Sequence, residues 1–349
     1  MWLPFMALVI QRVRCAMSNK LLIVFLPFFL LVSSAIAEDA TGKVTPEILR
    51  CVVKLETNPD ASGKYERGTG FFVSESVSRG GKQTRRTFLV TNKHMVGDWT
   101  WSSPVIKNYK DYINAIVYTV HPIEGKYYKK LRVNIKERDN NLNHILRIHP
   151  NPNIDVVIFD LTEEIDKTDD LNIRSFDVSY LMPFYSISDQ LIGIGDQVFA
   201  LGYPFGISSV KHNFPIAKSG YIASIPSEPF YSQVLIDEDS DQPVIKRVAA
   251  DITVIDGLIV PGNSGGPVIL ANELKSRRDP KTNQVQFSSK QTENYIIGIV
   301  SYGFSGSGLS FVFSTDYIRS LIETYIEEKF PVPRLKLIND PSNLSNRDD

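Results

Sequence analysis

Cysteine is scarce in this chain of 349 residues. The sequence holds two cysteines, and only Cys51 lies beyond the first 37 residues. A disulfide needs two partners, so the later part of the chain has no internal disulfide, which excludes the class of small disulfide-stapled scaffolds. Cys51 stands in the apolar stretch LRCVVKLE, where we expect a buried small hydrophobe rather than a nucleophile.

An excess of charge of one sign is also absent. The chain has 38 basic and 39 acidic residues, and its formal net charge is -1. Arg79, Lys82, Arg85 and Arg86 form a local basic cluster that we interpret as a solvated hairpin tip, so no nucleic-acid partner is expected. The sequence also lacks a His-Glu-x-x-His helix and a phosphate-cradling glycine loop, so no metal and no cofactor are expected.

Only one long apolar run is present. It reads LLIVFLPFFLLV over residues 21–32, follows Lys20 and precedes the small residues SSAIA, which end at Ala37. The run is short for a membrane span and contains Pro27. A positive residue, a short apolar run and small residues in this order are typical of a secretory signal peptide, here residues 1–37 with cleavage after Ala37.

The predicted signal determines the expected compartment. Residues 1–16 are interpreted as an upstream extension, because a start at Met17 would give a signal of normal length. We expect a periplasmic or secreted protein with no stable membrane span after cleavage. An anchor that stays uncleaved is the alternative.

Short stretches rich in Val, Ile, Phe and Tyr are abundant. Gly, Pro, Asn, Asp and Ser separate them, and this pattern predicts an all-β barrel or sandwich. The predicted strands cover residues 51–56, 68–74, 87–92, 115–121, 155–161, 197–203, 219–225, 247–254, 266–270, 295–303 and 309–315.

One helix is expected near the end of the chain. Over residues 314–330, apolar residues recur at helical spacing, and Thr315 or Ser314 could cap the first turn. The tail 331–349 is expected to be flexible. We see no repeat of solenoid period, so residues 38–330 are expected to form one domain.

A serine among glycines interrupts an otherwise apolar segment, LIVPGNSGGPVI, at residues 258–269. Such a cluster can simply make a sharp turn. It can also present a reactive hydroxyl, because a Gly-x-Ser turn aims the N–H groups of Gly262 and Ser264 into one small oxyanion hole. Gly265 and Gly266 would then let a substrate approach the backbone closely.

A serine nucleophile needs a base, and the base needs a carboxylate to orient it. Of the five histidines, His94 directly follows a predicted buried strand in VTNKHMV, which would hold it rigidly. Asp155 opens the apolar strand DVVIFDL, where burial is costly unless a donor pairs with it. Asp160 has the opposite parity on that strand and is interpreted as structural or solvated.

These segments occur in one order: GTGFFV, FLVTNKHMV, NIDVVIFDL, GDQVFALGYPFG, AKSGYIASI, DGLIVPGNSGGPV and IIGIVSYG with GLSFVF. Over about residues 46–328 the sequence resembles the trypsin-like serine proteases of the HtrA/Deg type. The resemblance implies two six-stranded antiparallel β-barrels, at about 46–165 and 190–315, with the active site in the crevice between them.

The resemblance also assigns roles. It implies that His94 is the base, Asp155 the orienting acid and Ser264 the nucleophile, with the N–H groups of Gly262 and Ser264 as the oxyanion hole. For substrate binding it implies backbone pairing along Ser301, Tyr302 and Gly303, which would extend a sheet with the bound chain. Leu258 at the base of the specificity pocket, with Gly303 and Gly308, suggests an apolar pocket.

Two features depart from the HtrA type. No PDZ-like domain follows the protease segment. The spacing of 61 residues between His94 and Asp155 also predicts an inserted hairpin or lid near residues 98–150. Its aromatic residues are expected to pack on the first barrel, or alternatively to form a protein-binding surface: Trp99, Trp101, Tyr109, Tyr112, Tyr118, Tyr127 and Tyr128.

The function expected from the sequence is an exported serine endopeptidase that cuts polypeptides, including unfolded proteins, after apolar residues. Two alternatives stay open. One is a catalytically silent module of the same fold that binds unfolded polypeptides. The other is a hydrolase of esters, because acyl transfer from an ester uses the same groups.

Overall fold

The computed structural model describes residues 43–59, 65–79, 82–100, 103–187, 192–235, 245–271, 276–278, 282–287, 294–303 and 307–331. The predicted signal peptide, and the predicted tail apart from Pro331, lie outside the described residues. The chain from Pro46 onward forms one compact unit, and everything below concerns that unit.

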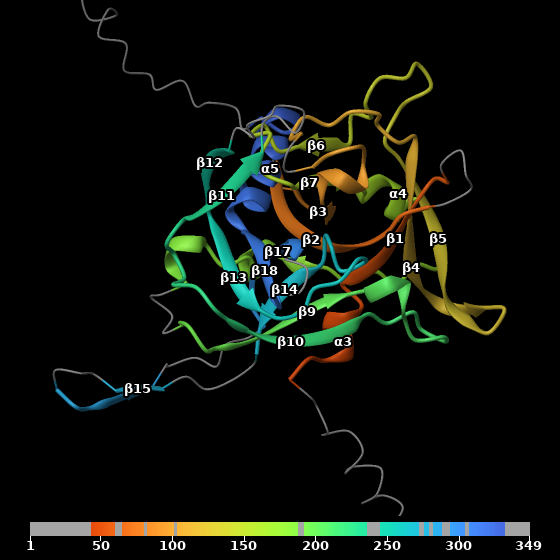
Figure 1. Ribbon diagram of the computed structural model, residues 1–349. Helices are drawn as coiled ribbons and strands as arrows, with labels where there is room; N and C mark the ends of the chain where they lie inside the picture. Colours follow the sequence, from red (N-terminus) through yellow and green to blue (C-terminus); the bar gives the residue numbers. More distant parts are fainter. Residues whose placement is uncertain are drawn as a thin grey trace, which may run out of the picture. The chain divides into compact units, whose positions relative to one another are not determined.

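Figure 1 shows its helices and strands. In chain order they are α3 (Pro46–Leu49), β1 (Val52–Thr57), β2 (Arg67–Arg79), β3 (Lys82–Thr91), β4 (Tyr112–Ile123), β5 (Lys126–Asn134), β6 (Leu146–Ile148), β7 (Val157–Asp160), α4 (Thr162–Asp166), β8 (Phe176–Asp177), β9 (Gln197–Gly202), β10 (Ile216–Ile222), β11 (Phe230–Leu235), β12 (Ile245–Ala250), β13 (Ile252–Asp256), β14 (Pro267–Leu270), β15 (Ser276–Arg278), β16 (Val285–Phe287), β17 (Ile296–Gly303), β18 (Leu309–Ser314) and α5 (Asp316–Lys329).

The first half of this unit is a curled sheet of eight strands in the order β5-β4-β1-β2-β3-β7-β6, with β8 added beside β2. All of its pairings are antiparallel except that of β2 with β8. Alternate residues along β1 are buried, because side chains of a strand point to opposite faces. One face of the sheet covers a core that includes Leu55, Phe72, Leu89, Val117 and Phe159.

The second half is a closed barrel of six strands, β10-β13-β18-β17-β14-β9. Its core includes Val198, Ile255, Val268, Val300 and Val312. The all-β class is therefore confirmed, and the second barrel has the expected six strands. The first sheet differs from a six-stranded barrel in having eight strands and two unjoined edges, β5 and β6.

The predicted insertion near residues 98–150 explains part of this difference. It contains the hairpin of β4 and β5, and β4 pairs with β1, so the hairpin extends the sheet. Trp99 and Tyr118 are buried, as expected for packing on the first sheet. The other predicted tyrosines of the insertion are partly exposed, and Trp101 lies outside the described residues.

Two tyrosine hydroxyls join the sheet to the barrel. The hydroxyls of Tyr118, on β4, and Tyr203, just after β9, lie 3.3 Å apart. Each also lies 3.1 Å from the carbonyl oxygen of Val52 on β1, and Tyr203 reaches the carbonyl of Asn213 at 3.0 Å. Both rings are buried, so this network satisfies polar groups that water cannot reach.

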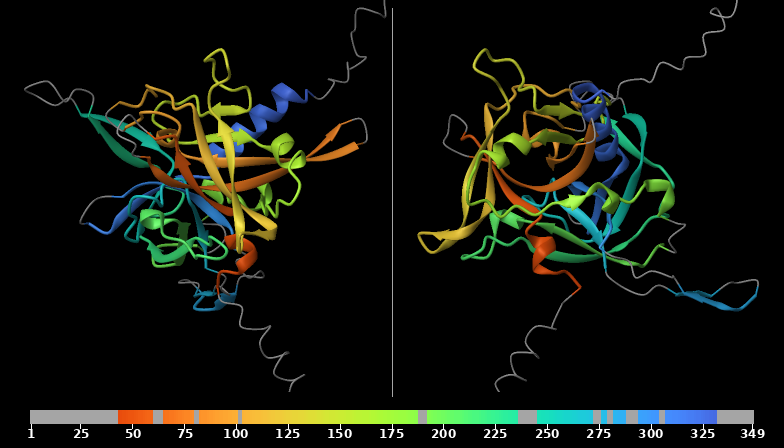
Figure 2. Two further views of the ribbon diagram at one scale, coloured as in Figure 1. Left: turned by 90° about the vertical axis from the view of Figure 1, so that its right-hand side faces the viewer. Right: turned by 180° about the vertical axis from the view of Figure 1, so that it is seen from behind.

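The C-terminal helix α5 confirms the helix predicted over 314–330. It packs against β6 and β7 of the first sheet and β18 of the barrel (Figure 2). Of the two predicted caps, Ser314 accepts a hydrogen bond from the N–H of Asp316, whereas the Thr315 hydroxyl donates to the carbonyl of Met182. In the described part of the chain, no helix is long and apolar enough to cross a membrane.

Asp160 is a structural residue at the end of β7, and only 2% of it is exposed. Its carboxylate accepts hydrogen bonds from the Arg86 guanidinium and from the N–H and hydroxyl of Thr162. Asp160→Asn should lower the free energy of unfolding by about 2–3 kcal/mol, because the half-buried guanidinium loses its charged partner. Urea unfolding measures this change.

The control for that experiment is Glu163→Gln, which removes a carboxylate from an exposed pair with Lys167. Exposed pairs contribute little to stability, so its urea midpoint should match that of the unchanged protein. Equal midpoints for Asp160→Asn and Glu163→Gln would contradict the structural role of Asp160.

Candidate active site

His94 lies at the centre of the candidate site, on the first sheet. Strand β3 ends at Thr91, and a short 3-10 helix, Lys93–Met95, begins two residues later. The buried Asn92 between them donates its side-chain amide to the carbonyl oxygen of Asp155 at 2.6 Å. This bond ties the histidine-bearing turn to the segment that leads into β7.

Asp155 is fully buried, and its carboxylate is surrounded by hydrogen-bond donors. One carboxylate oxygen accepts from the backbone N–H of His94 at 3.2 Å. The other lies 2.8 Å from Nδ1 of the His94 ring and accepts the hydroxyl of Ser301 at 2.7 Å. These three donors offset the desolvation of the buried carboxylate.

The pairing with Asp155 determines which ring nitrogen of His94 can act as a base. An ionised carboxylate only accepts, so Nδ1 carries the proton and Nε2 is left with a lone pair. Burial by itself would lower the pKa of His94, but the charge of Asp155 and its hydrogen bond outweigh burial and raise that pKa. The side chain is 29% exposed, so a reactant can reach the ring.

Ser264 lies in the turn between β13 and β14 of the barrel. Its backbone carbonyl accepts from the N–H of Thr69 on β2, which joins the turn to the first sheet. Its hydroxyl donates to the carbonyl of Ser301 at 3.4 Å, and among the described residues no hydrogen bond joins it to His94. Such bonds are often long or misaligned without a substrate, and rotation about the Cα–Cβ bond redirects the hydroxyl.

The glycines on either side of Ser264 are required by the backbone. Gly262 has a φ of 99° and Gly265 a φ of 85°, a region that side chains rarely allow. A Cβ atom on Gly262 would stand 2.2 Å from the carbonyl oxygen of Tyr203, and one on Gly265 would stand 2.1 Å from that of Thr69. The turn therefore packs backbone against backbone from both halves of the unit.

Two backbone donors of this turn have no acceptor within the described part of the chain. The N–H groups of Asn263, Gly265 and Gly266 donate within the protein, but among the described residues those of Gly262 and Ser264 do not. The Pro261 carbonyl accepts from the N–H of Phe205 at 2.8 Å. In a trans peptide the N–H points opposite to the carbonyl, so the Gly262 N–H is directed away from Phe205.

The family model of the trypsin-like peptidase domain matches residues 68–274, which is more than half of the chain. The chain belongs to the trypsin-like peptidase family. No curated protein matches the sequence.

Many solved structures are similar to this peptidase, among them two proteases from bacteria. The Rv3671c protease from M. tuberculosis, in its active form, is 16% identical with a TM-score of 0.41, over 80% of this chain and 83% of that one. The MamO protease domain from Magnetospirillum magneticum, in its apo form, is 12% identical with a TM-score of 0.43, over 79% of this chain and 97% of that one.

Thr69 is a residue of the peptidase that the sequence reasoning missed. It is fully buried, and its hydroxyl donates to the carbonyl of Gly262 at 2.6 Å and accepts from the N–H of Tyr203 at 3.1 Å. Together with the Phe205 contact, it fixes the peptides on both sides of Gly262. A polar residue between two glycines in GTGFFV was the available signal.

The predicted substrate-pairing residues lie at the end of β17. Tyr302 and Gly303 pair with β18, while the pairing of β17 with β14 ends at Ile299 and Pro267. Beyond that point, no strand that the structure describes pairs with the second edge of β17. The Ser301 carbonyl faces the Ser264 hydroxyl, so this edge runs beside the candidate nucleophile.

The predicted pocket residues are close together but less enclosed than expected. Leu258 is 55% exposed, and its carbonyl accepts from the Lys218 ammonium. The N–H of Gly257 donates to the carbonyl of Gly308 at 2.9 Å, and a Cβ atom on Gly303 would stand 3.1 Å from the carbonyl oxygen of Ile259. The loop with Leu258 and the strand with Gly303 therefore lie side by side, as the two sides of the predicted specificity pocket.

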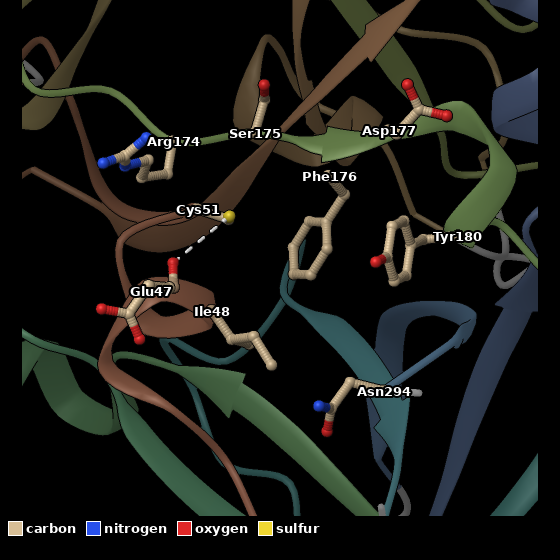
Figure 3. A pocket seen from close by; sticks show the side chains of 9 residues that line it. All are labelled: Glu47, Ile48, Cys51, Arg174, Ser175, Phe176, Asp177, Tyr180 and Asn294. Carbon is tan, nitrogen blue, oxygen red and sulfur yellow. Dashed lines mark hydrogen bonds between the residues drawn. The ribbon is translucent and has the colours of Figure 1, made fainter. Parts of the chain in front are cut away.

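A separate cavity of about 500 Å³ lies away from these residues, beside α3 and β8 (Figure 3). Cys51 lines it, 5% exposed, and its thiol donates to the carbonyl of Glu47 at 3.5 Å. Burial raises the pKa of Cys51 to about 12. A thiol with such a raised pKa is protonated near neutral pH. The prediction that Cys51 is buried is confirmed.

Proposed function

We propose that this peptidase is an exported serine endopeptidase in which His94, Asp155 and Ser264 form the catalytic triad. The observation that best supports this proposal is the hydrogen bond from His94 Nδ1 to the buried Asp155. Ser301 connects the Ser264 turn to the same carboxylate, because its carbonyl accepts from the Ser264 hydroxyl and its own hydroxyl donates to Asp155. Only an unprotonated Nε2 can remove a proton from a serine hydroxyl. Export through the signal predicted in residues 1–37 is part of the proposal.

The reaction follows from these groups. His94 Nε2 takes the proton of the Ser264 hydroxyl while the serine oxygen bonds to the substrate carbonyl carbon. The N–H groups of Gly262 and Ser264 donate to the resulting oxyanion. The carbon–nitrogen bond then breaks, and the imidazolium returns its proton to the leaving amine. Water, activated by the same nitrogen, releases the acyl group from Ser264.

The proposed specificity is for apolar residues before the cut. Leu258 supplies an apolar surface beside Gly303, and the Lys218 ammonium already sits on the Leu258 carbonyl. A second cation there would be repelled, which disfavours a lysine or arginine of the substrate. Pairing along Ser301, Tyr302 and Gly303 uses main-chain groups, so polypeptides of varied sequence, including unfolded proteins, are the proposed substrates.

The test uses protein purified after expression of the full-length chain. A fluorophosphonate probe should label the native protein, and mass mapping should place the adduct on Ser264, because only an activated serine reacts with it. Native protein should also digest casein, with mapped cuts that follow mainly apolar residues.

Heat-denatured protein is the control for both measurements. A native protein that neither reacts with the probe nor digests casein would favour the binding module over the enzyme. Labelling without casein digestion would favour an ester hydrolase. Cuts confined to positions after lysine or arginine would remove the apolar specificity while leaving the triad in place.

A further inference from the structure

Lys93, the residue before His94, is a buried cation that the mechanism above does not use. Only 2% of it is exposed, although lysine is rarely buried without a charged partner. Its ammonium donates to the carbonyl oxygens of Asn151 at 2.8 Å and Pro152 at 3.4 Å. Within the described structure it makes no ion pair.

These two carbonyls belong to the segment that leads into Asp155. The indole N–H of Trp99 also donates to the Pro152 carbonyl, at 3.0 Å. Asn151 is held in addition by a hydrogen bond from its N–H to Nδ1 of His149 at 3.2 Å. Lys93 and Trp99 therefore hold the middle of the segment three to four residues before the carboxylate that orients His94.

Burial of Lys93 is unfavourable for folding. Desolvation lowers its pKa from 10.5 to about 8, and the charge of Asp155 opposes that shift only in part. Since the folded protein releases this proton at lower pH than the unfolded chain, the stability cost is fully present below pH 8 and is relieved between about pH 8 and 10.5. Because the buried charge of Lys93 lowers the stability of the fold, its place next to the catalytic histidine indicates a role in the active site.

We propose that Lys93 is a positioning residue, whose ammonium holds the Asn151 and Pro152 carbonyls and thereby sets the place where Asp155 meets His94. The inference rests on the proposed function. Two titratable groups, Asp155 and His149, interact with the ammonium, and His94 is adjacent in sequence. Asp155 attracts it, and His149 is kept neutral because burial and the charge of Lys93 lower its pKa to about 4.

The pH dependence follows from this arrangement. Loss of the Lys93 proton leaves a weaker donor to the two carbonyls and removes the positive charge near Asp155. Activity should therefore fall as the pH rises through about 8. Arginine stays charged throughout this range, so a protein with Lys93→Arg should keep its activity there.

The experiment measures the rate of fluorophosphonate labelling from pH 6 to 10. The unchanged protein should lose rate above about pH 8. Lys93→Arg should remove that loss. Lys93→Met should react roughly tenfold more slowly at pH 7, with no fall on the alkaline side, because the charged donor to the two carbonyls is lost at every pH.

A melting curve separates positioning from a purely structural role. Removal of the buried charge should leave the melting temperature of Lys93→Met at pH 7 unchanged or higher. A structural lysine would give the opposite result, with a lower melting temperature and an unchanged labelling rate. Lys129→Met is the matched control, because its ammonium also donates to a backbone carbonyl, that of Asp169, but at an exposed site.

Two outcomes would overturn the inference while the proposed function stands. The first is a labelling rate of the protein without substitution that does not fall between pH 8 and 10. This measurement involves no variant, so a folding defect cannot explain it. The other is a Lys93→Met protein with the rate and pH profile of Lys129→Met. A protein that is never labelled would instead refute the proposed function, and the inference with it.

Discussion

Ser264→Ala should abolish reaction with the fluorophosphonate and slow casein digestion by roughly 10⁴- to 10⁶-fold, the range found when the nucleophile of a serine protease is removed. The alanine has no oxygen to form the acyl-enzyme bond. The oxyanion donors are the backbone N–H groups at positions 262 and 264, which the substitution leaves in place. A small residual rate above that in water is therefore expected. The measurement is initial-rate digestion with matched protein concentrations.

Ser264→Ala should fold as well as the unchanged protein. The hydroxyl makes one long hydrogen bond, 3.4 Å to the Ser301 carbonyl, so its loss should change the melting temperature little. Ser179→Ala is a fair comparison, because it removes a hydroxyl that donates to Asp177 on the surface. If Ser264→Ala digests casein as fast as Ser179→Ala, Ser264 is not the nucleophile.

Asp155→Asn should slow digestion by about 10⁴-fold, for a different reason. The asparagine amide would donate to His94 Nδ1, which forces the ring proton onto Nε2, where the base is needed. The charge that raises the pKa of His94 would also be lost, so the acid side of the remaining pH profile should shift to lower pH. Digestion rates from pH 4 to 9 measure both effects.

Asp160→Asn provides the contrast for Asp155→Asn. Both carboxylates are buried near β7, but Asp155 faces His94 and Ser301, whereas Asp160 faces Arg86 and Thr162. Asp155→Asn should lose activity at nearly constant stability, and Asp160→Asn should lose stability at constant labelling rate per folded molecule. An Asp155→Asn protein with undiminished digestion would contradict the role given to Asp155.

The sequence predicts those parts of the molecule that depend on local pattern. Short stretches rich in Val, Ile, Phe and Tyr, separated by turn residues, predict the all-β class. Helical spacing predicts α5, whose end residues differ by only one or two. The parity of Asp155 and Asp160 separated two carboxylates that the structure places in different surroundings. Ser314 and Thr315 could not be distinguished as caps, because the choice depends on Met182, which is distant in sequence.

Other features depend on packing between distant segments and could not be predicted. Thr69 reads as one polar residue in an apolar strand, and only the fold brings its hydroxyl to Gly262. Lys93 reads as a surface lysine, because nothing local shows that residues 151–152 cover it. The exposure of Leu258 depends on neighbouring loops, so an enclosed pocket could not be tested from spacing alone.

The turn around Gly262 has a consequence for control of the enzyme. Phe205 and Thr69 hold that turn through hydrogen bonds from folded parts of the chain. We therefore expect the proposed peptidase, once exported and free of its signal, to be competent as soon as it folds, without a further cut in its own chain. Its activity would then be limited by the compartment to which the protein is exported and by the supply of unfolded polypeptides in that compartment.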